Sequence, residues 1–368
     1  MYPHHNTLMI PPKKYCGRGF RLIALLMVLI TIVLIFGSVA INKHVINPAA
    51  WPHFAVLSGV MPALPDDGGF SRGATLRDPS TIIKSKDEFW VFYSGPGVMS
   101  YHSKDMVHWE PGPSVFDRKP YWVDQTAPGN LGDYWAPDII HLSDRYFLYY
   151  AVSVLDKNTS AIGLATNPTL DPNDPAYKWT DLGVVVQSQE SDDFNAIDPA
   201  IFHDEDGSLW LTFGSYWSGI KLVQLDPQTG KRITPDSPMT PLANNTSIEA
   251  SYLYKHAGYY YLFVNWGWCL RGEDSTYTIR VGRSKNITGP YLDKDGVDML
   301  LGGGSKFLGN KGRLIGPGHA GIIADNGKNW FSCHFEYDEA RSGANTLALM
   351  PLQWRTDGWP EVDMSPIY

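Results

Sequence analysis

Apolar and polar positions alternate in a pattern that recurs five times along this chain. Each repeat has a short apolar strand, a polar turn and an aromatic-rich second strand, which is typical of a β-hairpin. The core of the second strand lies eleven residues after the residue that opens the repeat. The opening residues are Asp78, Trp135, Asp198, Glu249 and His319. Five such hairpins within roughly 300 residues predict an all-β fold, a five-bladed β-propeller.

The repeat predicts that the five opening residues occupy equivalent positions near the propeller axis. Three of them, Asp78, Asp198 and Glu249, are carboxylates. We expect these side chains to converge in a narrow, partly desolvated funnel. Because carboxylates this close repel one another, the pKa of at least one should rise. Two carboxyl groups with separated pKa values are what glycoside hydrolysis requires, one as an acid and one as a base or nucleophile.

A single Asp-Pro pair is more often a turn or a cap than part of an active site. Here Asp78-Pro79 and Asp198-Pro199 stand at the same phase of two repeats. Glu249 stands at that phase in a third repeat, where a turn has no need of Glu. The recurrence favours an active site over three unrelated turns.

Hairpin geometry predicts which other residues lie on the same face as the opening residues. The first strand leaves that face and the second returns to it. Residues about 16 to 19 positions after the opening residue should therefore lie beside it. For the third repeat these are Ser215, Tyr216 and Trp217, beside Asp198, and for the first repeat they are residues 95–97.

The other two opening residues allow two interpretations each. His319 lies in the segment Gly316-Pro317-Gly318-His319-Ala320-Gly321. It is either a hydrogen-bonded core residue or, facing three acids, a ligand of a hard cation such as Ca²⁺ whose other positions are filled by water. Trp135 is either a core residue or a platform for the apolar face of a sugar ring.

The N-terminal region predicts export through a membrane. Residues 22–41 form an uncharged run of 20 residues, long enough to cross a bilayer, and Lys13, Lys14, Arg18 and Arg21 precede it. Positive flanks stay in the cytosol, which predicts a cytosolic tail (1–21), a signal-anchor transmembrane helix (22–41), a stalk (42–70) and an exported propeller (71–368), a type II arrangement. The alternative is a cleaved signal peptide, with residues 38–40 as the cleavage site and a secreted product.

The charge of the exported part restricts its partners. Five of the 30 basic residues precede Asp66, the first acidic residue, which leaves 25 basic against 38 acidic residues and a formal net charge of −13. This charge argues against nucleic acid and acidic polymers as partners and favours a neutral ligand. We expect a monomer.

Cysteines and glycosylation motifs add little to the fold prediction. The three cysteines form no disulfide framework. Cys269 and Cys333 could pair, or both could be unpaired buried thiols, while Cys16 is a candidate acylation site or an inert thiol. Sequons occur at Asn158, Asn244, Asn245 and Asn286 and matter only in a cell that glycosylates exported proteins.

Six motifs in order give the chain a specific resemblance. They are Arg77-Asp78-Pro79-Ser80, Tyr134-Trp135-Ala136-Pro137-Asp138, Asn195-Ala196-Ile197-Asp198-Pro199, Gly214-Ser215-Tyr216-Trp217-Ser218-Gly219, Ile248-Glu249-Ala250-Ser251 and Gly316-Pro317-Gly318-His319. From about Leu76 to Trp359 the chain resembles glycoside hydrolase family 43, and within it the endo-1,5-α-L-arabinanases.

The resemblance implies a five-bladed propeller that hydrolyses with inversion. By this resemblance Asp78 is the general base, Glu249 the general acid, and Asp198 the residue that raises the pKa of Glu249 and orients it. His319 would hold a calcium ion, mostly through water. The implied substrate-binding residues are Asp78, Trp135, Asn195, Ala196, Ile197, Asp198, Ser215, Tyr216 and Trp217. The implied substrate is arabinan, which forms side chains of pectin, cut at internal α-1,5 linkages.

Departures from the family pattern leave alternatives open. Arg77 stands where the family commonly has His, and Ala320-Gly321 follows His319 where arabinanases often have a polar residue. A membrane anchor is also unusual in this family. The alternatives are an exo-acting α-L-arabinofuranosidase or β-xylosidase of the same clan, a catalytically silent sugar-binding propeller, and a fructan-acting propeller enzyme. The last lacks support because its asparagine-rich nucleophile segment is missing from the first blade.

Overall fold

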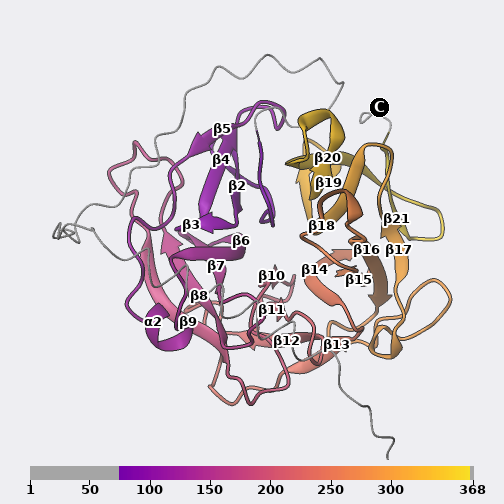
Figure 1. Ribbon diagram of the computed structural model, residues 1–368, viewed down its shortest axis with the longest axis horizontal. Helices are drawn as coiled ribbons and strands as arrows, with labels where there is room; N and C mark the ends of the chain where they lie inside the picture. The colour runs from indigo at the N-terminus through magenta and orange to yellow at the C-terminus, as the bar shows by residue number, and fades with distance from the viewer. Residues whose placement is uncertain (1–73, 365–368) are drawn as a thin grey trace, which may run out of the picture. The chain divides into compact units, whose positions relative to one another are not determined.

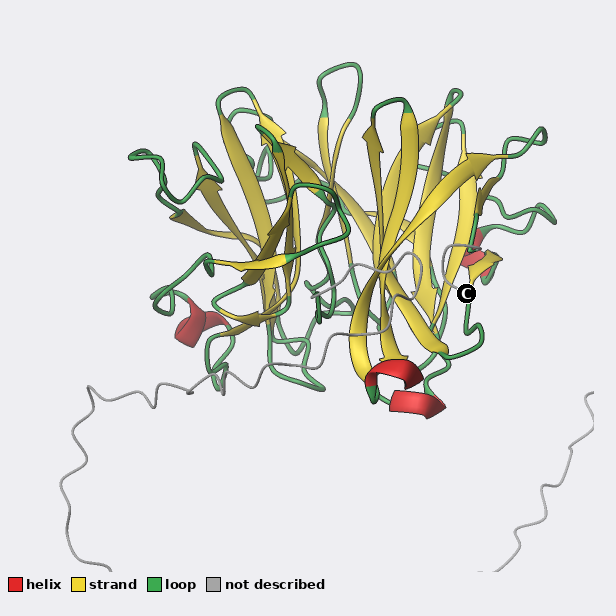
Figure 2. Ribbon diagram, turned by 90° about the horizontal axis from the view of Figure 1, so that it is seen from above, coloured by secondary structure: helices red, strands yellow, loops and turns green. Residues whose placement is uncertain are grey.

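Five antiparallel sheets surround a central axis in the computed structural model, which describes residues 74–364 (Figure 1). The prediction of a five-bladed β-propeller is confirmed. Strands and loops make up nearly all of the described chain, and the one α-helix in it, α2 (Val123–Thr126), has four residues (Figure 2).

The first two blades come from the N-terminal part of the described chain. Blade 1 contains β1 (Ile83–Ser85), β2 (Glu88–Tyr93), β4 (Met99–Ser103) and β5 (Glu110–Gly112). Blade 2 contains β6 (Asp133–Leu142), β7 (Arg145–Val152), β8 (Ser160–Asn167) and β9 (Thr180–Ser188), and β3 (Gly95–Pro96) pairs with the edge of β6.

The remaining three blades each consist of four consecutive strands. Blade 3 contains β10 (Ala200–His203), β11 (Leu209–Phe213), β12 (Ile220–Leu225) and β13 (Thr240–Ala243). Blade 4 contains β14 (Ile248–His256), β15 (Tyr259–Trp266), β16 (Thr278–Ser284) and β17 (Ser305–Leu308). Blade 5 contains β18 (Leu314–Asp325), β19 (Lys328–Asp338), β20 (Ala344–Trp354) and β21 (Pro360–Val362).

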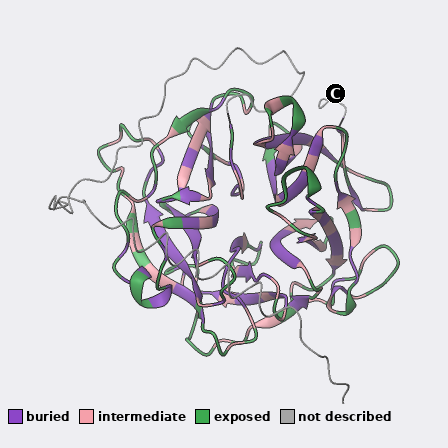
Figure 3. Ribbon diagram, in the orientation of Figure 1, coloured by how far each residue is buried: buried purple, intermediate pink, exposed green. Residues whose placement is uncertain are grey.

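The first strands of the blades lie nearest the axis, and the second strands are largely buried (Figures 1 and 3). Each predicted hairpin is present as the first two strands of a blade; in blade 3, for example, Ala200 pairs with Thr212 and His203 with Leu209. Apolar side chains of neighbouring sheets pack into continuous clusters between the blades. The turns that join the strands alternate between the two faces of the ring.

One residue in the inner segment of every blade has a left-handed backbone. These residues are Asp78 (φ 49°), Ala136 (43°), Asp198 (56°), Ala250 (51°) and His319 (55°). They mark the equivalent positions of the five blades, so the predicted equivalence is wrong by one residue for Trp135 and Glu249. In these blades the ladder is interrupted by a bulge that begins at Trp135 and at Glu249. Aspartate and histidine, which occupy three of these positions, adopt left-handed backbone more often than most residues.

A buried carboxylate joins the inner segments of three blades. Asp138, which is 4 % exposed, accepts hydrogen bonds from the backbone N–H of Thr81 in blade 1 (2.9 Å) and of Ile201 in blade 3 (2.8 Å). Burial raises the pKa of Asp138, against the hydrogen bonds that lower it. Asp138 thus links the backbones of blades 1 and 3 through its side chain, where no strand pairing of the described chain joins the sheets.

The ring closes between blades 5 and 1 without a shared strand. An apolar cluster fills this junction and contains Ala74, Leu76, Ile82, Phe89, Val91, Trp109, Ile323, Leu347 and Leu349. A salt bridge between Lys84 and Asp325 (2.9 Å) lies at its edge. Packing rather than strand exchange therefore holds the first and last blades together.

Several predictions about other features can be compared with the structure. The predicted tail (1–21), transmembrane helix (22–41) and stalk (42–70) all lie outside the described residues. Within residues 74–364, no helix is long and apolar enough to cross a membrane. Cys269 and Cys333 are both free, so the possible bridge between them is not formed. Cys333 is fully buried, whereas Cys269 is partly exposed.

The predicted glycosylation motifs differ in accessibility. The Asn158 side chain is 5 % exposed and donates to three backbone carbonyls, those of Gln189, Asp192 and Phe194. A glycan cannot be attached to this nitrogen in the folded protein. Asn244 and Asn286 are exposed and remain possible acceptors.

Candidate active site

A pocket of about 1040 Å³ lies at one end of the propeller axis and is lined by residues from all five blades. It contains the three predicted carboxylates. The predicted site residues that line it are Asp78, Trp135, Asn195, Ile197, Asp198, Ser215, Tyr216, Trp217, Glu249 and His319. Ala196 does not line it, because this residue is fully buried in the core between blades 2 and 3.

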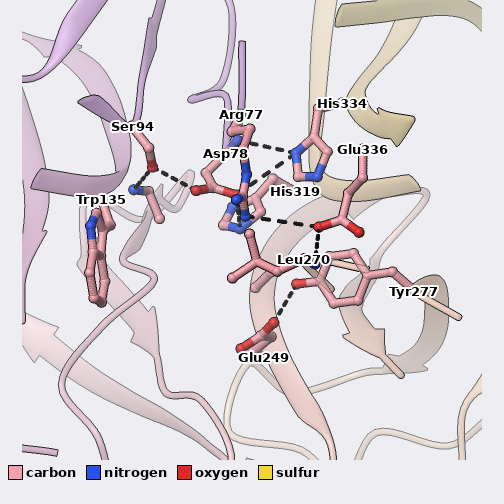
Figure 4. Close-up of polar contacts among 12 residues, drawn as sticks. Arg77, Asp78, Ser94, Trp135, Glu249, Leu270, Tyr277, His319, His334 and Glu336 are labelled. Atoms are coloured by element: carbon pink, nitrogen blue, oxygen red, sulfur yellow. Dashed lines mark hydrogen bonds and ion pairs between the residues drawn. The ribbon is translucent and has the colours of Figure 1, made fainter. Parts of the chain in front are cut away.

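Asp78 is held by residues of blades 1 and 5 (Figure 4). The Ser94 hydroxyl donates to Asp78 Oδ2 (2.6 Å), and His319 Nε2 lies 3.3 Å from Oδ1. The backbone N–H of Asp78 donates to His334 Nδ1 (3.1 Å). Ser94 also accepts from the backbone N–H of Ala136 (2.8 Å), which ties this arrangement to blade 2.

The environment of Asp78 keeps it ionised. Burial would raise its pKa, but the electrostatic interactions with His319, Arg77 and His334, together with the Ser94 hydrogen bond, outweigh burial and hold the pKa of Asp78 well below its usual range. Burial lowers the pKa of His334 to about 3, so this imidazole is neutral and can accept the Asp78 N–H. An ionised carboxylate of this kind can accept a proton from a water molecule.

Glu249 is 8 % exposed and has a hydrogen-bond partner for each carboxyl oxygen. Ser215 Oγ donates to Oε2 (2.8 Å), and the Tyr277 hydroxyl donates to Oε1 (2.8 Å; Figure 4). Burial and the charge of Glu249 raise the pKa of Tyr277, so its hydroxyl keeps its proton. These two contacts fix the direction in which Glu249 faces the pocket.

The charges of both other carboxylates affect the pKa of Asp198. Asp198 is 7 % exposed, and its Oδ2 accepts from the backbone N–H of Ala250 (3.1 Å), the residue that follows Glu249. Burial, then the charge of Glu249 and that of Asp78, raise the pKa of Asp198 well above its usual range. The pocket therefore combines a carboxyl group whose pKa is lowered, Asp78, with a buried carboxyl group whose pKa is raised, Asp198, next to Glu249.

The structure adds site residues that the sequence analysis did not name. Ser94 follows Asp78 by 16 residues, within the hairpin rule of about 16 to 19, whereas His334 follows His319 by 15 residues, one short of that range. Tyr277 precedes β16, the third strand of blade 4. Hairpin geometry places the loops between second and third strands on the pocket face, and Tyr277 lies in such a loop.

The correct phase of blade 2 was also present in the sequence. Pro79, Pro137 and Pro199 each follow the left-handed residue of their blade. Aligning the prolines, rather than the residues before the apolar run, places Ala136 in register with Asp78 and Asp198. Trp135 then precedes this position, as Glu249 does in blade 4.

The predicted calcium site has no protein ligand set in the described part of the chain. Within residues 74–364, no group of three or more His, Cys, Asp or Glu side chains is arranged to hold a metal ion. Calcium takes six to eight oxygen ligands, whereas His319 offers one nitrogen, which lies 3.3 Å from Asp78 Oδ1. Calcium at the axis stays a prediction, and no step below depends on it.

Comparison with known families shows to which family the chain belongs. The model of the glycosyl hydrolases family 43 matches residues 73–360. The chain belongs to glycosyl hydrolase family 43. It is therefore a glycosidase, and the three carboxylates in the pocket are its candidate catalytic groups.

Curated relatives in this family include both exo- and endo-acting enzymes. The chain is 40 % identical to an extracellular exo-α-(1→5)-L-arabinofuranosidase of Cellvibrio japonicus, over 78 % of this chain and 86 % of that protein. It is 37 % identical to an extracellular endo-α-(1→5)-L-arabinanase of Bacillus subtilis, over 88 % of this chain and 96 % of that protein.

Solved structures agree with the family assignment. A Cellvibrio cellulosa α-L-arabinanase complexed with arabinohexaose superposes with a TM-score of 0.76 at 38 % identity, over 80 % of this chain and 97 % of that one. An endo-arabinanase from Bacillus licheniformis gives a TM-score of 0.73 at 39 % identity, over 80 % of this chain and 99 % of that one.

Proposed function

We propose that this protein hydrolyses internal α-1,5-L-arabinofuranosyl linkages of arabinan with inversion at the anomeric carbon. One observation supports this most strongly. Asp78, Asp198 and Glu249 come from three different blades and line one pocket, and their surroundings lower the pKa of Asp78 and raise that of Asp198. Inverting glycosidases need this combination of a base and an acid.

In the proposed mechanism Asp78 is the general base. It takes a proton from a water molecule as the water attacks the anomeric carbon. His319, Ser94 and the His334 contact fix the direction of its carboxylate. Because the base activates water and does not itself attack, no covalent glycosyl-enzyme forms.

Glu249 is the proposed general acid, which donates its proton to the oxygen of the departing sugar. Ser215 and Tyr277 orient its carboxyl group. Asp198 acts on Glu249 in two ways. Its contact with the Ala250 N–H positions the backbone next to Glu249. When Asp198 is ionised, its negative charge also makes the ionisation of Glu249 less favourable.

The substrate assignment rests on the names of the relatives, which are arabinanases or arabinofuranosidases. The net negative charge agrees with a neutral polysaccharide, and arabinan side chains of pectin fit this description. Exo action is the second candidate, because the relative from Cellvibrio japonicus, which is 40 % identical, is named as exo-acting.

Products from linear arabinan distinguish the two modes. An endo enzyme releases oligosaccharides of mixed length and lowers viscosity early, whereas an exo enzyme releases one short product and lowers viscosity slowly. Release of a single product from the first minutes onward would overturn the endo assignment. No hydrolysis of arabinan or its oligosaccharides would overturn the substrate assignment itself.

Glu249→Gln tests the role of the acid. The amide keeps the size of the side chain but has no proton to donate, so turnover of arabino-oligosaccharides should fall by roughly two to four orders of magnitude. Binding, measured by calorimetry, should remain close to that of the wild type. Undiminished turnover in this variant would contradict the assignment.

For location, we propose an exported catalytic domain held in a membrane by residues 22–41. Support comes from the uncharged run of 20 residues behind four basic ones and from relatives named as extracellular. The full chain should stay with membranes during alkaline carbonate extraction. A soluble product that starts near residue 41 would instead indicate a cleaved signal peptide.

A further inference from the structure

The loop between β15 and β16, residues 267–277, displays apolar side chains at the rim of the pocket. Trp268 is 55 % exposed and Leu270 is 56 % exposed. Both line the pocket, as do Trp217 and Leu155, which are also among the large apolar side chains that the described surface exposes. Exposed apolar groups gathered at one place on a surface usually mark a contact with a ligand.

Hydrogen bonds hold this loop in one conformation. The backbone N–H of Trp268 donates to Thr276 Oγ1 (3.0 Å), and Ser275 Oγ donates to the Trp268 carbonyl (3.1 Å). The backbone N–H of Leu270 donates to Glu336 Oε1 in blade 5 (2.9 Å; Figure 4). Because the backbone is already ordered, little conformational entropy is lost when a ligand covers the Trp268 ring.

The Trp268 ring also has neighbours that set its orientation. Its centroid lies 6.2 Å from that of Tyr216, at an interplanar angle of 48°. The Arg271 guanidinium lies over the ring, 5.6 Å from its centroid. An indole that has these neighbours and is still more than half exposed presents an apolar surface of the kind that binds the carbon face of a sugar.

The position of the loop shows which part of the substrate would reach it. Glu249 and Trp268 flank the same strand pair, since Glu249 pairs with Asn265 and Trp268 follows the end of β15. The general acid lies next to the oxygen that leaves. Sugars beyond that oxygen must therefore extend along the Glu249 side of the pocket, whereas Asp78 and its water lie on the opposite face of the reacting sugar.

We infer that Trp268, oriented by Tyr216 and Arg271, forms a binding subsite for the first sugar of the leaving group. This inference rests on the proposed function and on Glu249 as the acid. It makes Trp268 a specificity-determining residue, because contacts with the departing part of the chain favour cutting within a polymer over removing a terminal unit with a small leaving group.

Two substrates with the same reacting sugar test the inference. Arabinohexaose has sugars on both sides of the cleaved bond, whereas α-L-arabinobiosyl fluoride has a leaving group of a single atom. For Trp268→Ala, kcat/KM on arabinohexaose should fall by about tenfold or more, while kcat/KM on the fluoride stays within about twofold of the wild-type value. Trp268→Phe, which keeps a ring, should retain most activity on both.

Tyr121→Ala is the matched control, since Tyr121 is an aromatic residue that is 84 % exposed and does not line the pocket. This variant should behave as the wild type on both substrates. Equal losses on the two substrates for Trp268→Ala, or no loss on arabinohexaose, would overturn the inference. Failure of the wild type to cleave either substrate would instead refute the proposed function.

Discussion

At the scale of single residues, Asp198 illustrates how a catalytic group can lower stability. Its raised pKa means that the folded protein binds a proton that the unfolded chain, with an ordinary aspartate pKa near 4, releases. Between that pH and the folded-state pKa, the free energy of unfolding therefore falls as pH rises. The cause is burial beside Glu249 and Asp78, which the reaction requires.

Asp198→Asn should therefore stabilise the fold and remove activity. The amide keeps an oxygen that can accept the Ala250 N–H but carries no charge. The gain in Tm over the wild type should increase from pH 4 to pH 7, as measured by differential scanning calorimetry across this range. A variant less stable than the wild type at every pH, or a gain that shrinks as pH rises, would contradict the pKa direction.

His334 should act as a positioning residue for the base. It is fully buried, and its Nδ1 accepts the backbone N–H of Asp78, a residue with left-handed backbone. His334→Leu removes this acceptor, and the displaced Asp78 should lower kcat by about 100-fold with little change in KM. His334→Asn places an oxygen near the position of Nδ1 and should recover most of the loss.

The pair of variants separates positioning from packing. A purely structural role would make both variants similarly less stable and similarly inactive. Steady-state kinetics with arabino-oligosaccharides, together with the Tm of each protein, decides between these outcomes. Equal kcat values for the Leu and Asn variants would show that the acceptor at Nδ1 is not what matters.

At the scale of strands and blades, the sequence predicts the hairpins well and their phase less well. Alternation of apolar and polar residues identifies the strand pairs because one face of each strand is buried. It does not report a left-handed residue within the inner strand. Trp135 and Glu249 lie one position before the left-handed residue of their blades, whereas Asp78 and Asp198 occupy that position.

Contacts between blades are the part of the fold that sequence pattern does not reveal. The role of Asp138 depends on Thr81 and Ile201, which are 57 and 63 residues away along the chain. Within blade 4, Tyr277 reaches Glu249 only because β16 starts on the face where β14 starts. Local periodicity contains no information about such pairs.

Asp138→Ala should destabilise the propeller through these contacts. It leaves two buried backbone N–H groups without an acceptor, which should lower the free energy of unfolding by about 2 to 5 kcal/mol. Urea denaturation followed by tryptophan fluorescence measures this loss. Asp325→Ala, at an ion pair with the partly exposed Lys84, is the control and should cost less than about 1 kcal/mol. A similar loss for both variants would contradict the proposed tie between blades.

At the scale of the whole molecule, closure of the ring depends on packing between blades 5 and 1. Leu347 is fully buried in the cluster at this junction. Leu347→Ala should lower the free energy of unfolding by about 3 kcal/mol, whereas Leu301→Ala, at a side chain that is 82 % exposed, should change it by less than about 0.5 kcal/mol. Equal losses in the free energy of unfolding for the two variants would show that packing at this junction does not stabilise the closed ring.

The overall architecture and most of the pocket can be predicted from the sequence, because residues at the same phase of a radial repeat lie near one axis. Once five hairpins are arranged around one axis, residues that open them must lie near each other. The position of the rim loop at Trp268 could not be predicted in this way, since that loop differs in length and composition from those of the other blades. The symmetric part of a propeller is thus predictable, and the individual loops that shape its pocket are not.

The stereochemistry of hydrolysis tests the central claim most directly. Proton NMR of the first products from a linear arabino-oligosaccharide reports the anomer formed before mutarotation. If Asp78 activates water while Glu249 protonates the leaving group, the new reducing end appears first as the β-anomer and the α-anomer follows only slowly. Initial release of the α-anomer would mean a covalent intermediate and would contradict the account.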